Sequence, residues 1–149
     1  MGDGGNSGSK DSDVDLRLSG KVVSRCCVDN AFILEILEKE AMTSIRIGGL
    51  MDMELAGDRL TLSGERPAEA GRACILMGKT IEHAVGRSDG SLEIAFTDGS
   101  RLDVPVDPHY EAWEASADDG FMVVSLPGGR LAVWSGRRNG SERPRDVVG

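Results

Sequence analysis

The stretch that decides the fold is Ser91–Val104, SLEIAFTDGSRLDV, in which apolar residues occupy every second position on both sides of an Asp-Gly pair. Alternation with a period of two predicts a β-strand with one buried face, and Asp-Gly is a strong signal for a hairpin turn. We therefore predict two antiparallel strands whose apolar side chains, Leu92, Ile94 and Phe96 in the first strand, point to the same core.

Similar short apolar runs, separated by turn residues, fill the middle of the chain. They predict further strands at Lys21–Asp29, Ala31–Leu37, Met42–Ile47, Met51–Leu55, Arg59–Leu62, Lys79–Gly86, Glu111–Ser116, Phe121–Leu126 and Arg130–Trp134. Only Pro67–Met77 departs from this period, and its first-turn proline and following Gly78 favour a helix. The predicted fold class is mainly β (β-rich α+β), with antiparallel meanders and hairpins in two similar halves joined by one short helix.

The two halves resemble each other in sequence at an offset of 58 residues. Gly20–Val23 resembles Gly78–Ile81, and Leu34–Ile36 resembles Leu92–Ile94. We hypothesise an internal duplication of residues 20–62 and 78–134 around a shared core. The alternative is that all hairpins share one hydrophobic pattern.

Polar, glycine-rich segments flank this region. Such segments bury too little apolar surface to offset the entropy lost on ordering. We expect a disordered N-terminal tail at residues 1–17, a single β-rich domain at 18–134 and a disordered C-terminal tail at 135–149.

The net charge of −8 over 149 residues limits the classes of partner. Nucleic acids and anionic membranes attract basic surfaces, so we expect neither as a partner; a basic protein fits better. The N-terminal stretch has no apolar signal-peptide core, and no apolar run reaches the ~18–20 residues of a transmembrane helix. We therefore expect a cytoplasmic protein, with its oligomeric state left open.

The sequence contains no recognisable catalytic, cofactor-binding or metal-binding motif, so we predict no residue for these roles and no cofactor. The three cysteines, Cys26, Cys27 and Cys74, are too few to close a disulfide framework and are interpreted as small buried hydrophobes. His83 is interpreted as a surface or half-buried strand residue.

One segment, Val106–Glu114, is unusually rich in aromatic and titratable side chains. It supplies our candidate binding surface: Asp107, His109, Tyr110, Glu111, Trp113 and Glu114. Tyrosine and tryptophan suit protein interfaces, whereas histidine and carboxylates can also ligate a metal or transfer a proton. A purely structural role stays open as well, with Pro105 and Pro108 bending the chain and Trp113 anchoring the core.

The end of the chain resembles a family of small uncharacterised bacterial proteins, a domain of unknown function. The similarity lies in the Pro-x-Tyr-Glu-Ala-Trp-Glu run at Pro108–Glu114, the Val-Ser-Leu-Pro-Gly-Gly-x-Leu-Ala-Val-Trp run at Val124–Trp134, and the Asp-Gly hairpin at Phe96–Leu102. The resemblance extends over Leu18–Trp134. It implies a β-rich cytoplasmic fold and assigns no catalytic residue.

Three functions are compatible with these observations. We favour a non-enzymatic protein-interaction module that binds a basic partner, in the manner of immunity proteins and small inhibitors. One alternative is a small-molecule or metal-binding protein, or an enzyme, that uses residues 107–114. The other is a structural or regulatory subunit that self-associates through exposed strand edges.

Overall fold

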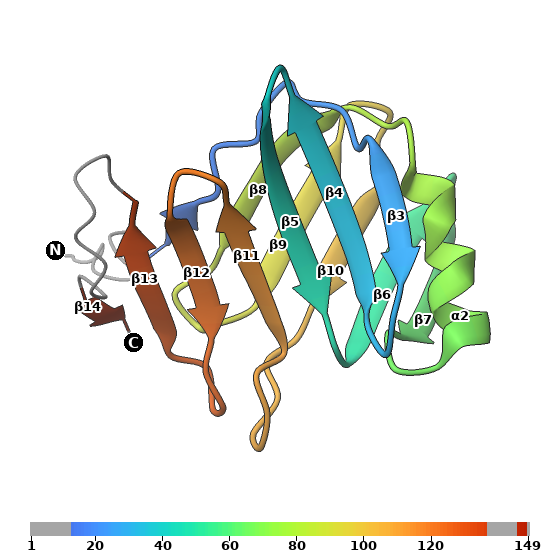
Figure 1. The fold of residues 1–149 in the computed structure, drawn as a ribbon. Helices are drawn as coiled ribbons and strands as arrows, with labels where there is room; N and C mark the ends of the chain where they lie inside the picture. Colours follow the sequence, from blue (N-terminus) through green and yellow to red (C-terminus); the bar gives the residue numbers. More distant parts are fainter. Residues whose placement is uncertain (1–12, 137–145, 149) are drawn as a thin grey trace, which may run out of the picture.

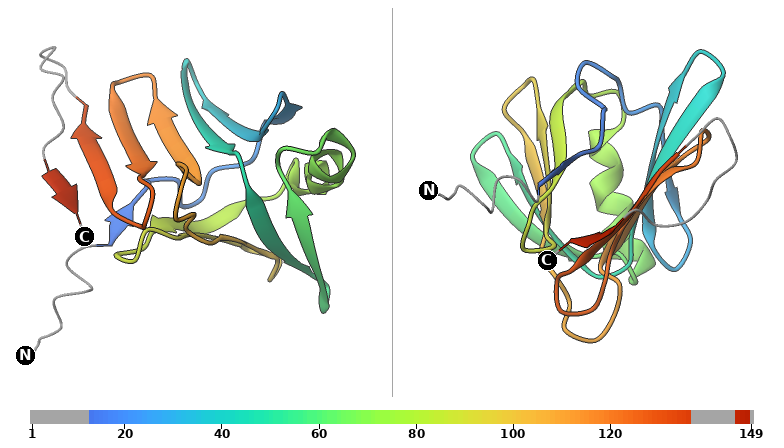
Figure 2. Two further views of the ribbon diagram at one scale, coloured as in Figure 1. Left: turned by 90° about the horizontal axis from the view of Figure 1, so that it is seen from below. Right: turned by 90° about the vertical axis from the view of Figure 1, so that its left-hand side faces the viewer.

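Two antiparallel β-sheets pack face to face in the computed structural model, which describes residues 13–136 and 146–148 (Figures 1 and 2). The six-stranded sheet has the spatial order β2 (Val14–Asp15), β8 (Ile81–Gly86), β9 (Leu92–Phe96), β10 (Arg101–Val104), β6 (Leu50–Leu55) and β7 (Asp58–Ser63). The seven-stranded sheet has the order β14 (Asp146–Val148), β13 (Leu131–Ser135), β12 (Phe121–Ser125), β11 (Trp113–Ala117), β5 (Ala41–Ile47), β4 (Phe32–Glu38) and β3 (Arg25–Val28). The predicted mainly β class is confirmed.

The core lies between the sheets and follows from the alternation in the sequence. Leu92, Ile94 and Phe96 of β9 are buried, as are Phe32 and Leu34 of β4, while the residues between them on β4 are partly exposed. The deciding hairpin forms as predicted, with Leu102 of β10 opposite Ile94. Both strands therefore contribute to one core that spans the two sheets.

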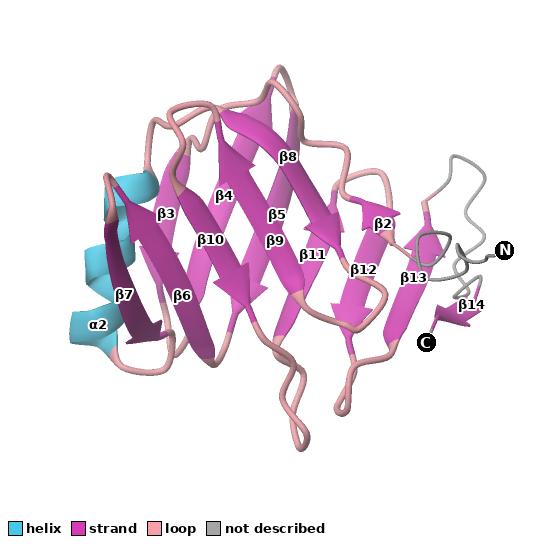
Figure 3. Cartoon of the chain, turned by 180° about the vertical axis from the view of Figure 1, so that it is seen from behind, coloured by secondary structure: helices cyan, strands magenta, loops and turns pink. Residues whose placement is uncertain are grey.

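The predicted helix at Pro67–Met77 is present as two consecutive pieces, the α-helix α2 (Pro67–Arg72) and the 3-10 helix η1 (Ala73–Leu76). Pro67 occupies the first turn, where backbone N–H groups make no hydrogen bond within the helix, so its missing N–H costs nothing. Ala70, Ala73 and Leu76 are buried. The helical segment lies beside β3 and β7, and so covers one open side of the sandwich (Figure 3).

The two halves of the chain repeat one topology. The first half forms a meander, β3-β4-β5, and crosses to the opposite sheet to form the hairpin β6-β7. The second half forms the meander β8-β9-β10 and crosses to form β11-β12-β13. The two halves pair with each other in both sheets. The last strand of the first meander, β5, pairs with β11 of the second half, and the last strand of the second meander, β10, pairs with β6 of the first half. Neither sheet is therefore built by one half alone.

Backbone hydrogen bonds between the halves have the same twofold arrangement. Val22 pairs with Thr80, its equivalent at the 58-residue offset. The N–H of Val23 donates to the carbonyl of Lys79 (3.0 Å), and the N–H of Ile81 donates to the carbonyl of Lys21 (2.8 Å). Exchanging the halves converts either of these bonds into the other, so an approximate twofold axis passes between Val22 and Thr80.

The boundaries of the folded region differ from our prediction. Leu16, which we placed in the N-terminal tail, is buried, because β2 pairs with β8 and directs this leucine into the core. Within the predicted C-terminal tail, β14 pairs with β13. The rest of both predicted tails, residues 1–12, 137–145 and 149, lies outside the described residues.

A buried carbonyl ties the second half together. The carbonyl oxygen of Gly90, in the β8-β9 turn, accepts hydrogen bonds from Trp113 Nε1 (2.9 Å) and from Ser125 Oγ (2.8 Å). The backbones of Gly90 and Gly129 touch, because a Cβ on Gly90 would lie 2.2 Å from the Gly129 oxygen. The Trp113 ring packs closely over Gly86, where a Cβ would lie 2.9 Å from the ring. Glycine at these positions lets the turn reach the tryptophan and the serine.

We expect Gly90→Ala to destabilise the protein much more than Gly99→Ala. Both glycines have positive φ angles, +95° and +93°, so alanine is strained at either position, by about 1–2 kcal/mol. Only at Gly90 does the added methyl group also collide with backbone, which raises the expected cost to at least about 3 kcal/mol. Urea denaturation followed by tryptophan fluorescence measures both values. An equal loss of unfolding free energy in the two variants would show that the backbone at Gly90 and Gly129 can move apart at no cost, and would contradict the prediction.

Candidate functional site

Among the described residues, three connections cross between the sheets: β2-β3, β5-β6 and β10-β11. The last two, which we call the first and the second crossing, lie side by side at one end of the sandwich, the lower end in Figure 1. The first crossing consists of Gly48 and Gly49 only, whereas the second extends over eight residues, 105–112. The N–H of Gly48 donates to the carbonyl of Ala112 (3.2 Å), which joins the two crossings. Two residues suffice to cross between these sheets, so the second crossing is longer than the topology requires.

The long crossing is held in shape by Asp107. Its Oδ1 accepts hydrogen bonds from the N–H groups of His109 (2.8 Å) and Tyr110 (3.0 Å), a turn arrangement for which aspartate is well suited. Its carbonyl accepts from the N–H of Gly128 in the β12-β13 turn (2.9 Å). These bonds fix the loop while leaving the Tyr110 side chain 72% exposed.

A pocket of about 400 Å³ lies between the two crossings. We call it the crossover groove, and it is lined by Asn30, Gly48, Gly49, Glu65, Asp107, Tyr110, Glu111 and Ala112. At Gly48 and Gly49 the φ angle is not positive, and no atom lies within 4 Å of where a Cβ would stand. Neither conformation nor packing within the described chain requires glycine there. Their effect is to leave backbone uncovered on the groove wall.

The groove is acidic. Glu65, Asp107 and Glu111 line it, and within residues 13–136 no cationic side chain pairs with the carboxylate of Glu65 or Glu111. A second depression of about 370 Å³ adjoins it and shares Gly49, Glu65 and Asp107. Two uncompensated carboxylates beside an exposed tyrosine can accept hydrogen bonds from a cationic group and place it against an aromatic ring.

The structure separates the six residues of the predicted binding surface. Asp107, Tyr110 and Glu111 line the groove together. His109 is exposed beside Tyr110, with ring centroids 6.4 Å apart, but does not line it. Trp113 is buried in the core, so its inclusion in a binding surface was wrong. The register of β11 places Glu114 beside Arg46 on the outer face of the seven-stranded sheet, away from the groove.

Sequence reasoning missed the residues that the rest of the chain contributes to the groove. Gly48 and Gly49 fell between two predicted strands, and neither they nor Glu65 and Asn30 were predicted as site residues. The feature that could have pointed to them is the pair of adjacent glycines between two strands, since neither glycine adopts the positive φ angle that a turn would require. No group of three or more histidine, cysteine, aspartate or glutamate side chains that could hold a metal ion occurs among the described residues.

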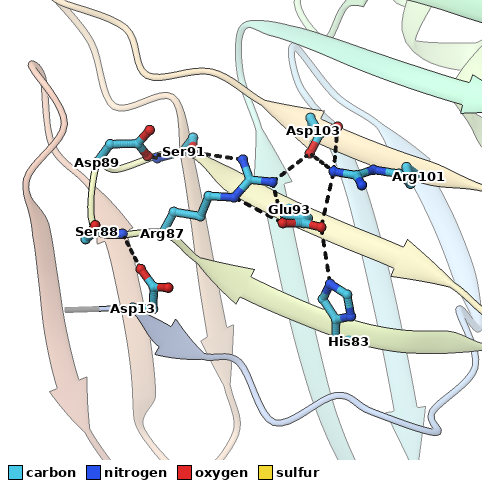
Figure 4. Close-up of polar contacts among 9 residues, drawn as sticks. All are labelled: Asp13, His83, Arg87, Ser88, Asp89, Ser91, Glu93, Arg101 and Asp103. Carbon is cyan, nitrogen blue, oxygen red and sulfur yellow. Dashed lines mark hydrogen bonds and ion pairs between the residues drawn. The ribbon is translucent and has the colours of Figure 1, made fainter. Parts of the chain in front are cut away.

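A second polar cluster lies on the outer face of the six-stranded sheet, centred on Glu93 (Figure 4). Glu93 is bonded to Arg87 (Nε 3.0 Å), Arg101 (3.2 Å) and His83 (3.3 Å), and Asp103 pairs with both arginines. Burial by itself would raise the pKa of the Glu93 carboxyl, but the bonds from Arg87 and His83 and the charges of both arginines outweigh it and lower the pKa. The charges in this cluster neutralise one another, which indicates a structural role.

The turn beside this cluster is fixed by Asp89. Its Oδ1 accepts hydrogen bonds from the N–H of Ser91 (2.9 Å) and from Ser91 Oγ (2.6 Å), and these bonds lower the pKa of Asp89. In addition, the N–H of Ser88 donates to the carboxylate of Asp13 (2.7 Å; Figure 4). This network holds the turn that presents the Gly90 carbonyl to Trp113.

A family model described as a family of unknown function (DUF6188) matches residues 14–135. The chain belongs to this family. The predicted resemblance to a domain of unknown function is thereby confirmed. Neither a curated protein nor a solved structure matches the chain.

The DUF6188 match begins at Val14 and ends at Ser135, the last residue of β13. It therefore includes both halves, both crossings and the Glu93 cluster. The N-terminal limit agrees with the position of β2 and with the burial of Leu16. No helix among the described residues is long and apolar enough to cross a membrane.

We expect Glu93→Gln to destabilise the protein at neutral pH by about 1–3 kcal/mol, because it removes one of the two carboxylates that Arg87 and Arg101 share and leaves Asp103 alone between them. The pKa of Glu93 is lower in the folded protein than its ordinary value of 4.5, so its stabilising effect is present above pH 4.5 and is lost as the pH falls through the folded value. The difference from wild type should therefore shrink below pH 4.5, as measured by urea denaturation across the pH range. Glu82→Gln, at an exposed position on β8, is the control and should change stability by less than about 0.5 kcal/mol. A pH-independent loss at Glu93 would contradict the ion-pair explanation.

Proposed function

We propose that the protein is a protein-interaction module that binds a basic segment of a partner protein in the crossover groove. The observation that carries the proposal is the longer second crossing, which presents Tyr110 and Glu111 at a place where two residues would complete the fold. Residues that the topology does not need, held by Asp107 in a defined conformation, are well suited to recognition.

Tyr110 supplies the apolar part of the proposed contact. A side chain that is 72% exposed contributes little to the core, and its ring remains available to a partner. Tyrosine offers large contact area with few rotatable bonds and a hydroxyl group at its tip, which is why it is common at the centres of interfaces. The ring can also accept an arginine or lysine side chain by a cation–π contact.

The carboxylates supply the charge. Glu65 and Glu111 have no cationic partner within residues 13–136, and the net charge of −8 gives the whole molecule a field that attracts basic partners. Complementary charge raises the association rate and selects against acidic partners. The bare backbone at Gly48 and Gly49 would let a partner's main chain or side chain approach closely.

We expect the peptide acetyl-Gly-Arg-Gly-Arg-Gly-amide to bind in the groove and to shift the NMR amide signals of Gly48, Gly49 and Tyr110. The double variant Glu65→Gln/Glu111→Gln should bind it at least about tenfold more weakly. The control is Glu40→Gln/Glu82→Gln, which changes the net charge equally at exposed positions outside the groove. If both double variants bind the peptide equally weakly, the interaction depends on net charge alone, which would contradict a specific site in the groove.

We also expect Tyr110→Ala to weaken the same peptide, by about fivefold to tenfold, without a change in net charge or in stability. Its stability is measured by urea denaturation, since the side chain packs little against the core.

Tyr110→Ala also serves as the comparison in a second experiment, in which the wild-type protein and the variant are each used to capture partner proteins from native lysate at physiological salt. A protein captured by the wild type and not by the variant supports the proposal. If the wild type recovers no protein, the proposal is contradicted.

A further inference from the structure

Two of the three cysteines lie together, although they are 48 positions apart in the sequence. Cys26 is on β3 and Cys74 is on η1, and both side chains are half-buried against the same core. η1 packs directly on β3. Cys27 follows Cys26 on the strand, so its side chain points to the outer face, where it contacts Arg25.

The closeness of Cys26 and Cys74 follows from two observations. The two side chains pack against the same core on elements that touch, and the Cys74 thiol is near enough to raise the pKa of Cys26. The approximate twofold axis gives the same result, because a shift of 58 residues relates Cys74 to Leu16 and Cys26 to Ala84. In that equivalent pair, the N–H of Leu16 donates to the carbonyl of Ala84 at 2.9 Å. The two cysteines therefore lie at the place where the equivalent residues, Leu16 and Ala84, make a direct backbone contact.

We propose that Cys26 and Cys74 are a redox-active pair that closes to an intramolecular disulfide when the protein meets a peroxide. Both thiols are free in the structure, and both are partly accessible. Closure would tie the helical segment α2-η1 to the edge strand β3. This inference does not depend on the proposed binding function of the groove.

The chemistry balances with hydrogen peroxide as the oxidant. The Cys74 thiol first releases its proton, and the thiolate attacks one peroxide oxygen. The O–O bond breaks, a sulfenic acid forms, and the departing hydroxide takes up that proton and leaves as water. The sulfur of Cys26 then attacks the Cys74 sulfur, and the sulfenic hydroxyl leaves as water with the proton of the Cys26 thiol. Two thiols are oxidised by two electrons in all, and one peroxide is reduced to two waters.

The environment of the two sulfurs assigns their order. Burial, with the neighbouring Cys74 thiol, raises the pKa of Cys26 to about 12, so this thiol stays protonated at neutral pH. A protonated thiol reacts poorly with peroxide. Cys74 is therefore the sulfur that reacts first, and Cys26 is the one that resolves the sulfenic acid.

The test exposes the whole protein to hydrogen peroxide and maps its peptides by mass spectrometry without reduction. We expect a Cys26–Cys74 link, about 2 Da lighter than the two free thiols and reversed by dithiothreitol. Oxidation should raise Tm by about 10 °C, because the bond closes a long loop. Cys27→Ser is the matched control and should form the link as wild type does, whereas Cys74→Ser should form none.

Other products would overturn the proposal. A Cys26–Cys27 link, a disulfide between two chains, or oxidation of Cys74 that stops at an acid without reaching Cys26 each means that the two sulfurs do not meet. Loss of the link in Cys27→Ser would also overturn it, since that residue should take no part. Because the readout is a covalent bond within the chain, failure here leaves the result for the groove unaffected.

Discussion

The structure depends on an exchange of strands between its two halves. Each meander ends on a strand whose outer neighbour comes from the other half, β5 beside β11 and β10 beside β6. An isolated half would leave that edge unpaired, with its backbone groups exposed to water or to another chain. The halves must therefore fold together, and the core that they share is held by contacts between residues far apart in the sequence. Such non-local pairing makes folding cooperative and comparatively slow.

This exchange also explains where the candidate site lies. The twofold arrangement brings the two crossings together at one end of the sandwich, so any residues added to either crossing meet the other one. The chain adds them to the second crossing only and keeps the first to two glycines. The symmetry is thus broken at the groove, while at the opposite end, around Val22 and Thr80, equivalent residues still pair. A site of this kind needs no change in the sheets that support it.

Much of the fold could be predicted from the sequence, because period-two alternation and Asp-Gly turns act locally. The strands and the buried face of β9 were predicted for that reason, and the helix at Pro67–Met77 was predicted from its first-turn proline and the glycine that follows it. Burial of Leu16 was not, although Val14, Leu16 and Leu18 alternate with polar residues, because this short run adjoins a polar, glycine-rich stretch and is buried only by pairing with β8. The site was predicted in part: Asp107, Tyr110 and Glu111 come from one segment, whereas Glu65 joins them only through the fold. Trp113 was misplaced because composition does not distinguish an aromatic of the core from one of an interface.

The distribution of charge separates the structural clusters from the candidate site. Glu93 is surrounded by Arg87, Arg101 and His83, and the two arginines neutralise its charge within the protein. Glu65 and Glu111 have comparable charge and no such partner within residues 13–136, although Arg66 stands next to Glu65 in the sequence and pairs with Glu69 instead. Like charges placed together in a concave surface repel one another, a cost that grows as water is excluded. A cationic group from a partner would offset such repulsion, and so these carboxylates would favour the bound protein over the free one.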